Sequence, residues 1–209
     1  MMSDLTAAAI DLLKDLIGIP SFSRQEDKTA DRIGEWFEHY GIPYQRDGNN
    51  LWAKNKAFDS KKPTLLLNSH HDTVKPNAAY TNDPFEAKIE DGKLYGLGSN
   101  DAGGALVSLI ALFTHYFNKE NPKYNLLVTA SAEEEIAGDD SLSGLLPKLP
   151  KIDVAIVGEP TEMHLAVAEK GLIVFDAVIT GTPGHAAHPN ADNPIMKLPE
   201  VLNWFENFK

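Results

Sequence analysis

The feature that most constrains this chain is a short apolar run that ends in two histidines and an aspartate. Leu65, Leu66 and Leu67 form the near-continuous apolar stretch of a β-strand that is buried on both faces. His70 follows at the carboxyl end of this strand, the edge of an open α/β sheet where ligands collect. Asp72 comes two residues later and, in extended backbone, lies on the same side as His70. This spacing suits a carboxylate that orients a metal-binding imidazole, although a strand running into a solvated loop gives the same pattern.

Composition narrows the possible partners and ligands. The 209 residues carry a net charge of −11, which argues against nucleic acid or an anionic membrane surface as a partner. Cysteine is absent, so disulfides and thiolate metal sites are excluded, and imidazole and carboxylate groups remain as ligands. The first residues lack the pattern of a secretory signal, and no apolar run approaches the length of a membrane span. We therefore expect a cytoplasmic protein that does not enter a membrane.

The order of the expected elements predicts an α/β domain. Ser23, with Glu26 three positions later, has the pattern of a capping box at the start of the second helix. Strands that alternate with helices in this way are typical of a sheet covered by helices. In chain order we expect helices at 3–17 and 24–40, strands at 42–47 and 50–55, the strand before His70, a hairpin at 85–95, a helix at 102–118, and buried strands at 124–130 and 153–158.

The pattern of the sequence changes at Gly171. A longer strand is expected from Leu172 to Thr180, followed by a loop rich in glycine, proline and histidine at 181–190. The segment 193–209 places apolar residues on one helical face. We therefore expect one domain at 1–170 and the beginning of a second domain at 171–209.

Acidic side chains follow the strands and the hairpin. A carboxylate can bridge two metal ions, and of two adjacent glutamates one can bind a metal while the other acts as a general base. So many carboxylates at one sheet edge would repel one another unless a cation neutralised them. A lone Glu-Glu pair usually faces solvent, but here the pair follows a buried strand directly. The residues concerned are His70 and Asp72, Asp101, Glu133, Glu134 and Glu135, and Glu159.

Four motifs resemble, in order and spacing, those of the di-zinc deacylases and exopeptidases. They are His70–Val74, Gly96–Asp101, Glu134–Gly138 and Gly158–Thr161. This family includes acetylornithine deacetylase, succinyl-diaminopimelate desuccinylase, aminoacylase and glutamate carboxypeptidase, and the motif wording looks closest to acetylornithine deacetylase. The resemblance implies a zinc-exopeptidase-like α/β catalytic domain, with a mixed, mostly parallel sheet flanked by helices. It also implies that 171–209 begins an α+β, ferredoxin-like lid domain that forms a homodimer.

The resemblance implies a metal-binding set. His70 and Glu159 would bind the first ion, Asp101 would bridge both ions, and Glu135 would bind the second. The ions would be two divalent metals, with zinc as the first choice and cobalt or manganese as alternatives. The family supplies a last histidine to the second ion from a later part of the chain, which this sequence lacks because it ends inside the first helix of the lid.

The resemblance also implies catalytic roles. Glu134 would take a proton from the bridging water and pass it to the leaving amine, and Asp72 would orient His70. His185, in the loop at 181–189, would stabilise the oxyanion in the partner's site, although a histidine that caps a loop gives the same sequence. His71 is expected to be a neighbour rather than a ligand. Gly103 departs from the family, because many members carry a lysine there.

Together these features predict a metal-dependent amidohydrolase that removes an acetyl or succinyl group from the amine of a small-molecule acyl-amino acid, such as N-acetylornithine. A dipeptidase or other exopeptidase could use the same metal ions. The missing histidine supports an alternative in which the chain is an inactive fragment of such an enzyme. A binding module that pairs through the lid strand remains a third possibility.

Overall fold

The computed structural model describes residues 2–168, 170–171, 173–189 and 192–208. The chain divides into two units, Met1–Leu165 and Ala166–Lys209, which are described separately. The predicted boundary between residues 170 and 171 lies close to this division and stays a prediction.

The first unit is built on a mixed sheet of five strands in the order β1-β2-β6-β3-β7. The antiparallel hairpin of β1 (Tyr44–Asp47) and β2 (Asn50–Lys54) lies at one edge, and β2 runs antiparallel to β6 (Asn125–Ser131). Strand β3 (Thr64–His70) lies between β6 and the edge strand β7 (Val154–Val157) and is parallel to both. This mixed sheet confirms the predicted α/β class.

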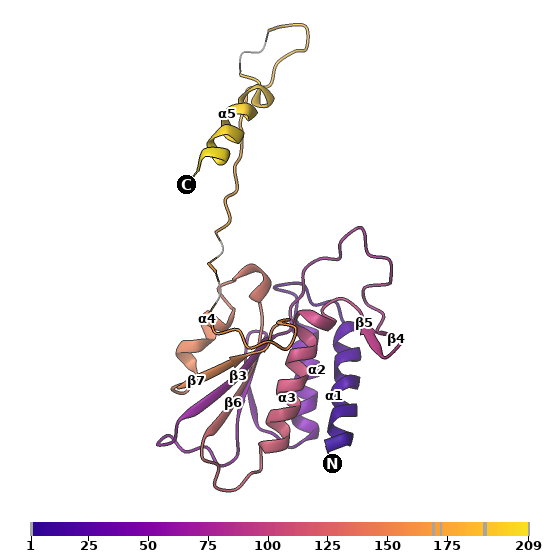
Figure 1. The fold of residues 1–209 in the computed structure, drawn as a ribbon, viewed down its shortest axis with the longest axis vertical. Helices are drawn as coiled ribbons and strands as arrows, with labels where there is room; N and C mark the ends of the chain where they lie inside the picture. The colour runs from indigo at the N-terminus through magenta and orange to yellow at the C-terminus, as the bar shows by residue number, and fades with distance from the viewer. Residues whose placement is uncertain (1, 169, 172, 190–191, 209) are drawn as a thin grey trace. The chain divides into compact units, whose positions relative to one another are not determined.

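Three helices cover one face of the sheet: α1 (Met2–Ile17), α2 (Asp27–His39) and α3 (Gly104–Tyr116) (Figure 1). Leu12, Ile33 and Phe113 are completely buried between these helices and the sheet. Leu67 of β3 packs into this core, whereas its neighbour Leu66 packs on the opposite face, below the short helix α4 (Leu142–Leu145). The apolar run before His70 is therefore buried on both faces, as its sequence predicts.

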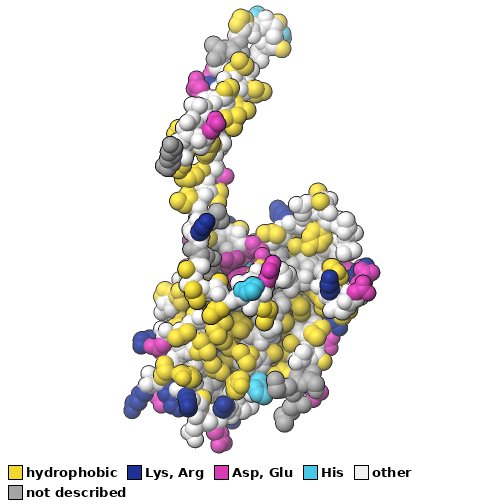
Figure 2. Space-filling model, viewed as in Figure 1, with side chains coloured by type: hydrophobic (Ala, Val, Ile, Leu, Met, Phe, Trp, Pro, Cys, Tyr) yellow, Lys and Arg dark blue, Asp and Glu magenta, His cyan; other side chains and the backbone are white. Residues whose placement is uncertain are grey.

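The remaining elements of this unit are short. The hairpin of β4 (Lys88–Glu90) and β5 (Lys93–Tyr95) forms a separate two-stranded sheet, with a first strand shorter than expected. A π-helical turn at Ser99–Gly103 leads into α3, and single 3-10 turns lie at Glu134–Ile136 and Leu146–Lys148. The edge strand β7 is exposed, and Figure 2 shows apolar side chains gathered on this side of the sheet.

The predicted capping box at the start of α2 is wrong. Glu26 occupies the N-cap position, but its side chain makes no capping hydrogen bond. The Ser23 hydroxyl donates instead to Asp72 Oδ2 at 2.8 Å, 49 residues away in sequence. The Glu26 carboxylate accepts from the backbone N–H of Arg24 at 2.7 Å and from that of Glu133 at 3.2 Å, and not from the N–H of Ser23 that a capping box requires.

In the second unit, α5 (Pro194–Asn207) confirms the expected helix, and the Asn193 side chain caps it by accepting from the Ile195 N–H. The strand expected at 172–180 is wrong for residues 173–180, while Leu172 lies outside the described residues. The side chains of Ile173 and Val178 are 76% and 84% exposed. A strand needs a neighbour for its N–H and C=O groups, and the described residues place none beside this segment.

No helix in the described parts of the chain is long and apolar enough to span a bilayer. The ferredoxin-like character of the second unit stays a prediction.

Candidate metal centre

The register of the sheet brings the predicted metal ligands to one edge. His70 lies opposite Ser131, so β3 and β6 end at the same level. Asn68 pairs with Val157, and Glu159, two residues further on, therefore comes level with His70. Asp101 arrives from the π-helical turn before α3, where the Asp101–Ala102 peptide bond is cis.

The His70 imidazole is buried and held in one tautomer. Its Nδ1 lies 3.0 Å from the Asp72 carbonyl oxygen and 3.2 Å from Asp72 Oδ1. Both oxygens can only accept, so Nδ1 carries a proton, and in the neutral ring the lone pair is on Nε2. These contacts to Asp72 fix the His70 ring so that Nε2 faces the acidic residues, and the role of Asp72 in orienting a metal ligand stays a prediction.

Three acidic side chains surround His70 Nε2. Asp101 Oδ1 lies 3.2 Å away, and Glu134 Oε2 and Glu159 Oε2 each lie 3.8 Å away. One donor atom each from His70, Asp101 and Glu159 falls within 4.8 Å of the other two. Donors about 2.1 Å from a tetrahedral zinc ion are about 3.4 Å apart, so the donor set and its spacing fit a single divalent cation.

The electrostatics of the cluster also favour a cation. Burial alone would lower the pKa of His70, but the hydrogen bond to Asp72 and the charges of Asp72, Glu159 and Glu134 raise it to about 9. Burial raises the pKa of Glu159 to about 7, with the charges of Glu134 and Asp101 acting in the same direction and His70 opposing them. The acidic groups thus repel one another, and a bound cation would relieve this repulsion.

Asp72 also holds the turn that carries the two adjacent glutamates. Its Oδ1 accepts from the Glu134 N–H and its Oδ2 from the Glu135 N–H, both at 3.1 Å. Burial would raise the pKa of Asp72, but the hydrogen bonds from His70, Ser23 and these two amides lower it below its usual range. One buried carboxylate therefore fixes both the imidazole and the Glu134–Glu135 turn.

A second ion would find fewer donors in this chain. Burial raises the pKa of Glu135, and the charge of Asp101 raises it further. Among the described residues, the only group of three or more candidate ligands is His70, Asp101 and Glu159. The described residues therefore fit one ion, and the role of Glu135 at a second ion stays a prediction.

His71 has no nitrogen left for a metal. Its Nε2 donates to the Asn49 carbonyl at 3.0 Å, and its Nδ1 accepts from the Thr29 hydroxyl at 2.9 Å. Burial lowers the pKa of His71, so the ring stays neutral in this tautomer. This histidine ties α2 and the β1–β2 turn to the end of β3.

Gly103, where the resembling family often carries a lysine, lies in a tight part of the backbone. A Cβ atom at this position would lie 2.6 Å from the Gly98 carbonyl oxygen and 2.7 Å from Leu13 Cδ1. Any larger residue would have to shift the loop that carries Asp101.

His185 belongs to the second unit and is exposed there. Its Nδ1 accepts from the Ala187 N–H at 3.1 Å, and its ring lies 5.6 Å from that of His188. These contacts neither test nor exclude a role for His185 at the site of another subunit, which stays a prediction.

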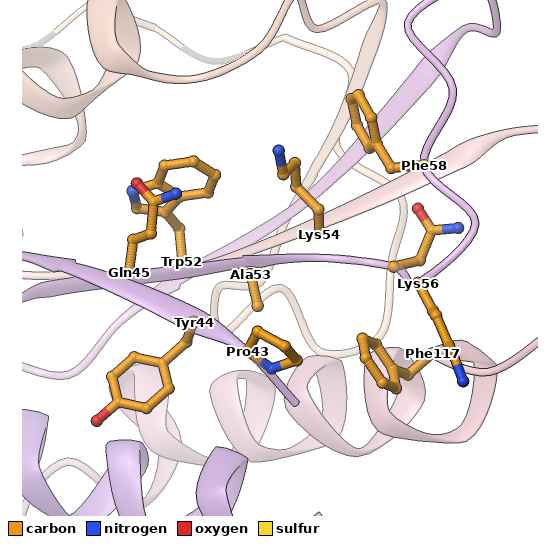
Figure 3. A pocket seen from close by; sticks show the side chains of 10 residues that line it. Pro43, Tyr44, Gln45, Trp52, Ala53, Lys54, Lys56, Phe58 and Phe117 are labelled. Atoms are coloured by element: carbon orange, nitrogen blue, oxygen red, sulfur yellow. The ribbon is translucent and has the colours of Figure 1, made fainter. Parts of the chain in front are cut away.

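Two side chains that contribute to the site were not assigned to it from the sequence. Ser23 contacts Asp72, and Glu26 accepts from the Glu133 N–H. The Ser-x-x-Glu spacing was their only signal, and it pointed to a helix cap. A separate open pocket of about 410 Å³, lined by Trp52, Lys54 and Phe58 among others, contains no residue of the metal-binding cluster (Figure 3).

Comparisons with known proteins identify a protein family whose matched range includes these motifs. The model of peptidase family M20/M25/M40 matches residues 66–199, a range that contains all four motifs. Succinyl-diaminopimelate desuccinylases from Rhodospirillum centenum and Buchnera aphidicola are 31% and 33% identical, over 93% and 95% of this chain. The alignments cover 55% and 56% of those proteins, so the chain spans about half the length of these relatives.

Solved structures show the same fold. An M20 family metallo-carboxypeptidase from Sulfolobus solfataricus matches with a TM-score of 0.60 and 27% identity, over 72% of this chain and 37% of that one. A Bacillus subtilis protein described as a dinuclear metal-binding peptidase of the M20 family matches with a TM-score of 0.56 and 20% identity, over 74% and 43%.

Proposed function

The chain belongs to peptidase family M20/M25/M40, and from this premise we propose that it carries the metal-binding half of an amidohydrolase acting on acyl-amino acids. The observation that supports this proposal is the convergence of His70 Nε2, Asp101 and Glu159 at the carboxyl edge of the sheet. Because the chain spans about half the length of its relatives, its activity and substrates are proposals as well.

The donor set supports His70, Asp101 and Glu159 as metal ligands, and the family resemblance adds Glu135. His70 and Glu159 would hold the first ion, Asp101 would be shared, and Glu135 would hold the second. Two divalent ions, zinc or alternatively cobalt or manganese, would supply a water of lowered pKa and polarise the scissile carbonyl.

The protein residues would then position the reactants and move the proton. Glu134 has a half-exposed side chain beside His70 and a backbone N–H held by Asp72, so its carboxylate can meet a water from a fixed position. It would accept a proton as general base and deliver it to the leaving amine as general acid. Asp72 would keep the His70 lone pair directed at the cluster.

The acyl group is proposed from two observations. The relatives at 31% and 33% identity are named succinyl-diaminopimelate desuccinylases, which supports a succinyl-amino acid. The motif wording supports an acetyl-amino acid such as N-acetylornithine as a second candidate. The Sulfolobus neighbour is a carboxypeptidase, which favours an exopeptidase as a further alternative.

Two further proposals concern whether one copy of this chain can be active by itself. We propose that 171–209 contributes to a homodimer in which His185 reaches the partner's site. An oxyanion donor of this type is worth about 3–4 kcal/mol in acyl-transfer sites. If the second ion has only Asp101 and Glu135, the chain would bind metal without turnover, which is the inactive-fragment alternative.

The test combines metal titration with turnover. Calorimetry should find at least one tight Zn²⁺ site per chain, and His70→Ala should remove it. Zinc-loaded protein is then assayed with N-succinyl-diaminopimelate, N-acetylornithine and dipeptides. Glu134→Gln should keep the tight site and abolish any turnover, because it removes the base but no ligand of the first ion. A chain that binds no divalent ion would refute the proposal.

A further inference from the structure

Glu26 is a buried carboxylate that has no part in the mechanism proposed above. It is completely buried, and among the described residues its side chain accepts hydrogen bonds from N–H groups. Its Oε1 accepts from the backbone N–H of Arg24 at 2.7 Å and from that of Glu133 at 3.2 Å. Its Oε2 accepts from the Asn49 side-chain amide at 3.0 Å. Hydrogen bonds to a buried carboxylate are among the stronger ones in a protein, so these three segments are firmly joined.

Glu133 needs such a restraint because of its backbone. It lies between β6 and the Glu134–Ile136 turn with φ 53° and ψ 25°, in the left-handed region that is uncommon for residues other than glycine. It is buried, its carbonyl accepts from the Gly138 N–H at 3.0 Å, and its side chain passes so close to Gly138 that a Cβ there would clash. Hydrogen bonds at both the N–H and the C=O of Glu133 thus hold the residue in a left-handed conformation that it would not adopt without them.

Three consecutive backbone N–H groups donate hydrogen bonds to two buried carboxylates. The Glu133 N–H donates to Glu26, and the N–H groups of Glu134 and Glu135 donate to Asp72. Ser23, three residues before Glu26, donates to the same Asp72 carboxylate. The loop at 23–26 therefore holds the Glu133–Glu135 turn at two points. Glu26 bonds the turn directly, and Ser23 bonds it indirectly through Asp72.

We propose that Glu26 is a positioning residue that fixes the start of the Glu133–Glu135 turn and so determines where the Glu134 and Glu135 carboxylates stand at the metal centre. The effect of Glu26 on catalysis rests on the proposed function. The restraint of the Glu133–Glu135 turn by Glu26 does not, because it is present in the metal-free chain. Without the Glu26 carboxylate, Glu133 would relax from its left-handed conformation. The next two side chains would then be displaced, although Asp72 would still hold their amides.

The test is amide hydrogen exchange, read by NMR on the full metal-free chain of the Glu26→Gln variant. Glutamine keeps the length of Glu26 but removes the charge and one acceptor. We expect exchange at the Glu133 amide to rise about tenfold or more, with a smaller rise at Glu134 and Glu135. The amides of Leu67 and Val128, in the core strands, should keep their wild-type rates. Glu35→Gln, an exposed glutamate on α2, is the matched control and should change none of these rates.

A second variant keeps the test decisive if Glu26→Gln does not fold. Asn49→Ala removes the donor to Glu26 Oε2 and, on the exposed side, the Asn49 Oδ1 acceptor of Arg46 Nη2. We expect a rise of about threefold confined to the Glu133 amide. An unchanged Glu133 rate in the variant that folds would overturn the proposal. A uniform rise across the sheet would also overturn it, because that result indicates a purely structural role.

Turnover separates this proposal from the proposed function. If the zinc-loaded wild type hydrolyses an acyl-amino acid, Glu26→Gln should lower kcat and leave KM within about twofold, since substrate contacts are intact. If Glu26→Gln lowered kcat/KM only by raising KM, with kcat unchanged, the positioning role would be overturned. If the wild type shows no turnover on any substrate, the proposed function fails, and the exchange rates still decide whether Glu26 holds the turn.

Discussion

Asp72→Asn should separate the two tasks of the buried aspartate. Its Oδ1 accepts from His70 Nδ1 at 3.2 Å and from the Glu134 N–H at 3.1 Å. Its Oδ2 accepts from Ser23 Oγ at 2.8 Å and from the Glu135 N–H at 3.1 Å. Asparagine has one oxygen, so in either orientation its NH₂ group faces two donors.

The less costly orientation follows from the partners. If the NH₂ group replaces Oδ2, the Ser23 hydroxyl can rotate and accept from it, and only the Glu135 N–H is left without a partner. One hydrogen bond to a charged group is then lost, and three others lose their charge assistance. At about 1.5–3 kcal/mol for a bond to a charged group, the free energy of unfolding should fall by about 2–4 kcal/mol.

Two measurements on the same protein give the result. Urea denaturation followed by circular dichroism measures the stability change, and calorimetry measures zinc affinity, which should fall about 10- to 100-fold because His70 is less firmly held. Asp153→Asn is the control: Asp153 accepts from the Thr64 N–H at the opposite end of the sheet, so zinc affinity should not change. If Asp72→Asn changed stability by less than about 0.5 kcal/mol and left zinc affinity intact, the reasoning about Asp72 would be refuted.

Three further outcomes are expected. Folded His71 stays neutral because burial lowers its pKa, whereas in the unfolded chain this histidine takes up a proton below about pH 6.5. As the pH drops, the free energy of unfolding of the wild type should therefore fall relative to that of His71→Gln. Urea melts should show a fall of at most about 1.4 kcal/mol per pH unit. Zinc at 100 times its dissociation constant should stabilise the wild type by about 2.7 kcal/mol in the same melts, and His70→Ala should abolish this gain. Phe113→Ala, at a fully buried position far from the cluster, should cost about 3–5 kcal/mol in urea melts without changing zinc affinity.

The sequence predicted those parts of the site that depend on local pattern and parallel pairing. Leu65 to Leu67 identified β3 because a strand buried on both faces must be apolar throughout. His70 and Glu159 could be expected to meet because parallel strands end at a common edge, and the register of β3 with β7 does bring them level. These inferences needed no knowledge of distant partners.

Features that depend on distant partners were missed. Ser23 and Glu26 have the spacing of a capping box, but Asp72 and Glu133, which lie 49 and 107 residues from them, take their hydrogen bonds. A local pattern cannot show that a buried acceptor or donor elsewhere will compete for the same side chain. The segment after Gly171 reads as a strand for the same reason, since its apolar residues cannot reveal whether a neighbouring strand is present.

The acids of this site fall into two kinds, and their surroundings distinguish them. Asp72 and Glu26 are fully buried, and N–H and O–H donors satisfy their oxygens, so their charge is tolerated without a cation. In the part of the chain that the structure describes, the carboxylates of Asp101 and Glu159 meet the His70 ring and other acids instead, and the pKa of Glu159 rises to about 7. A carboxylate surrounded by donors holds the structure in place, whereas one surrounded by like charges needs an external positive charge. By this criterion the metal should be bound by Asp101 and Glu159, and Asp72 and Glu26 should fix the geometry around it.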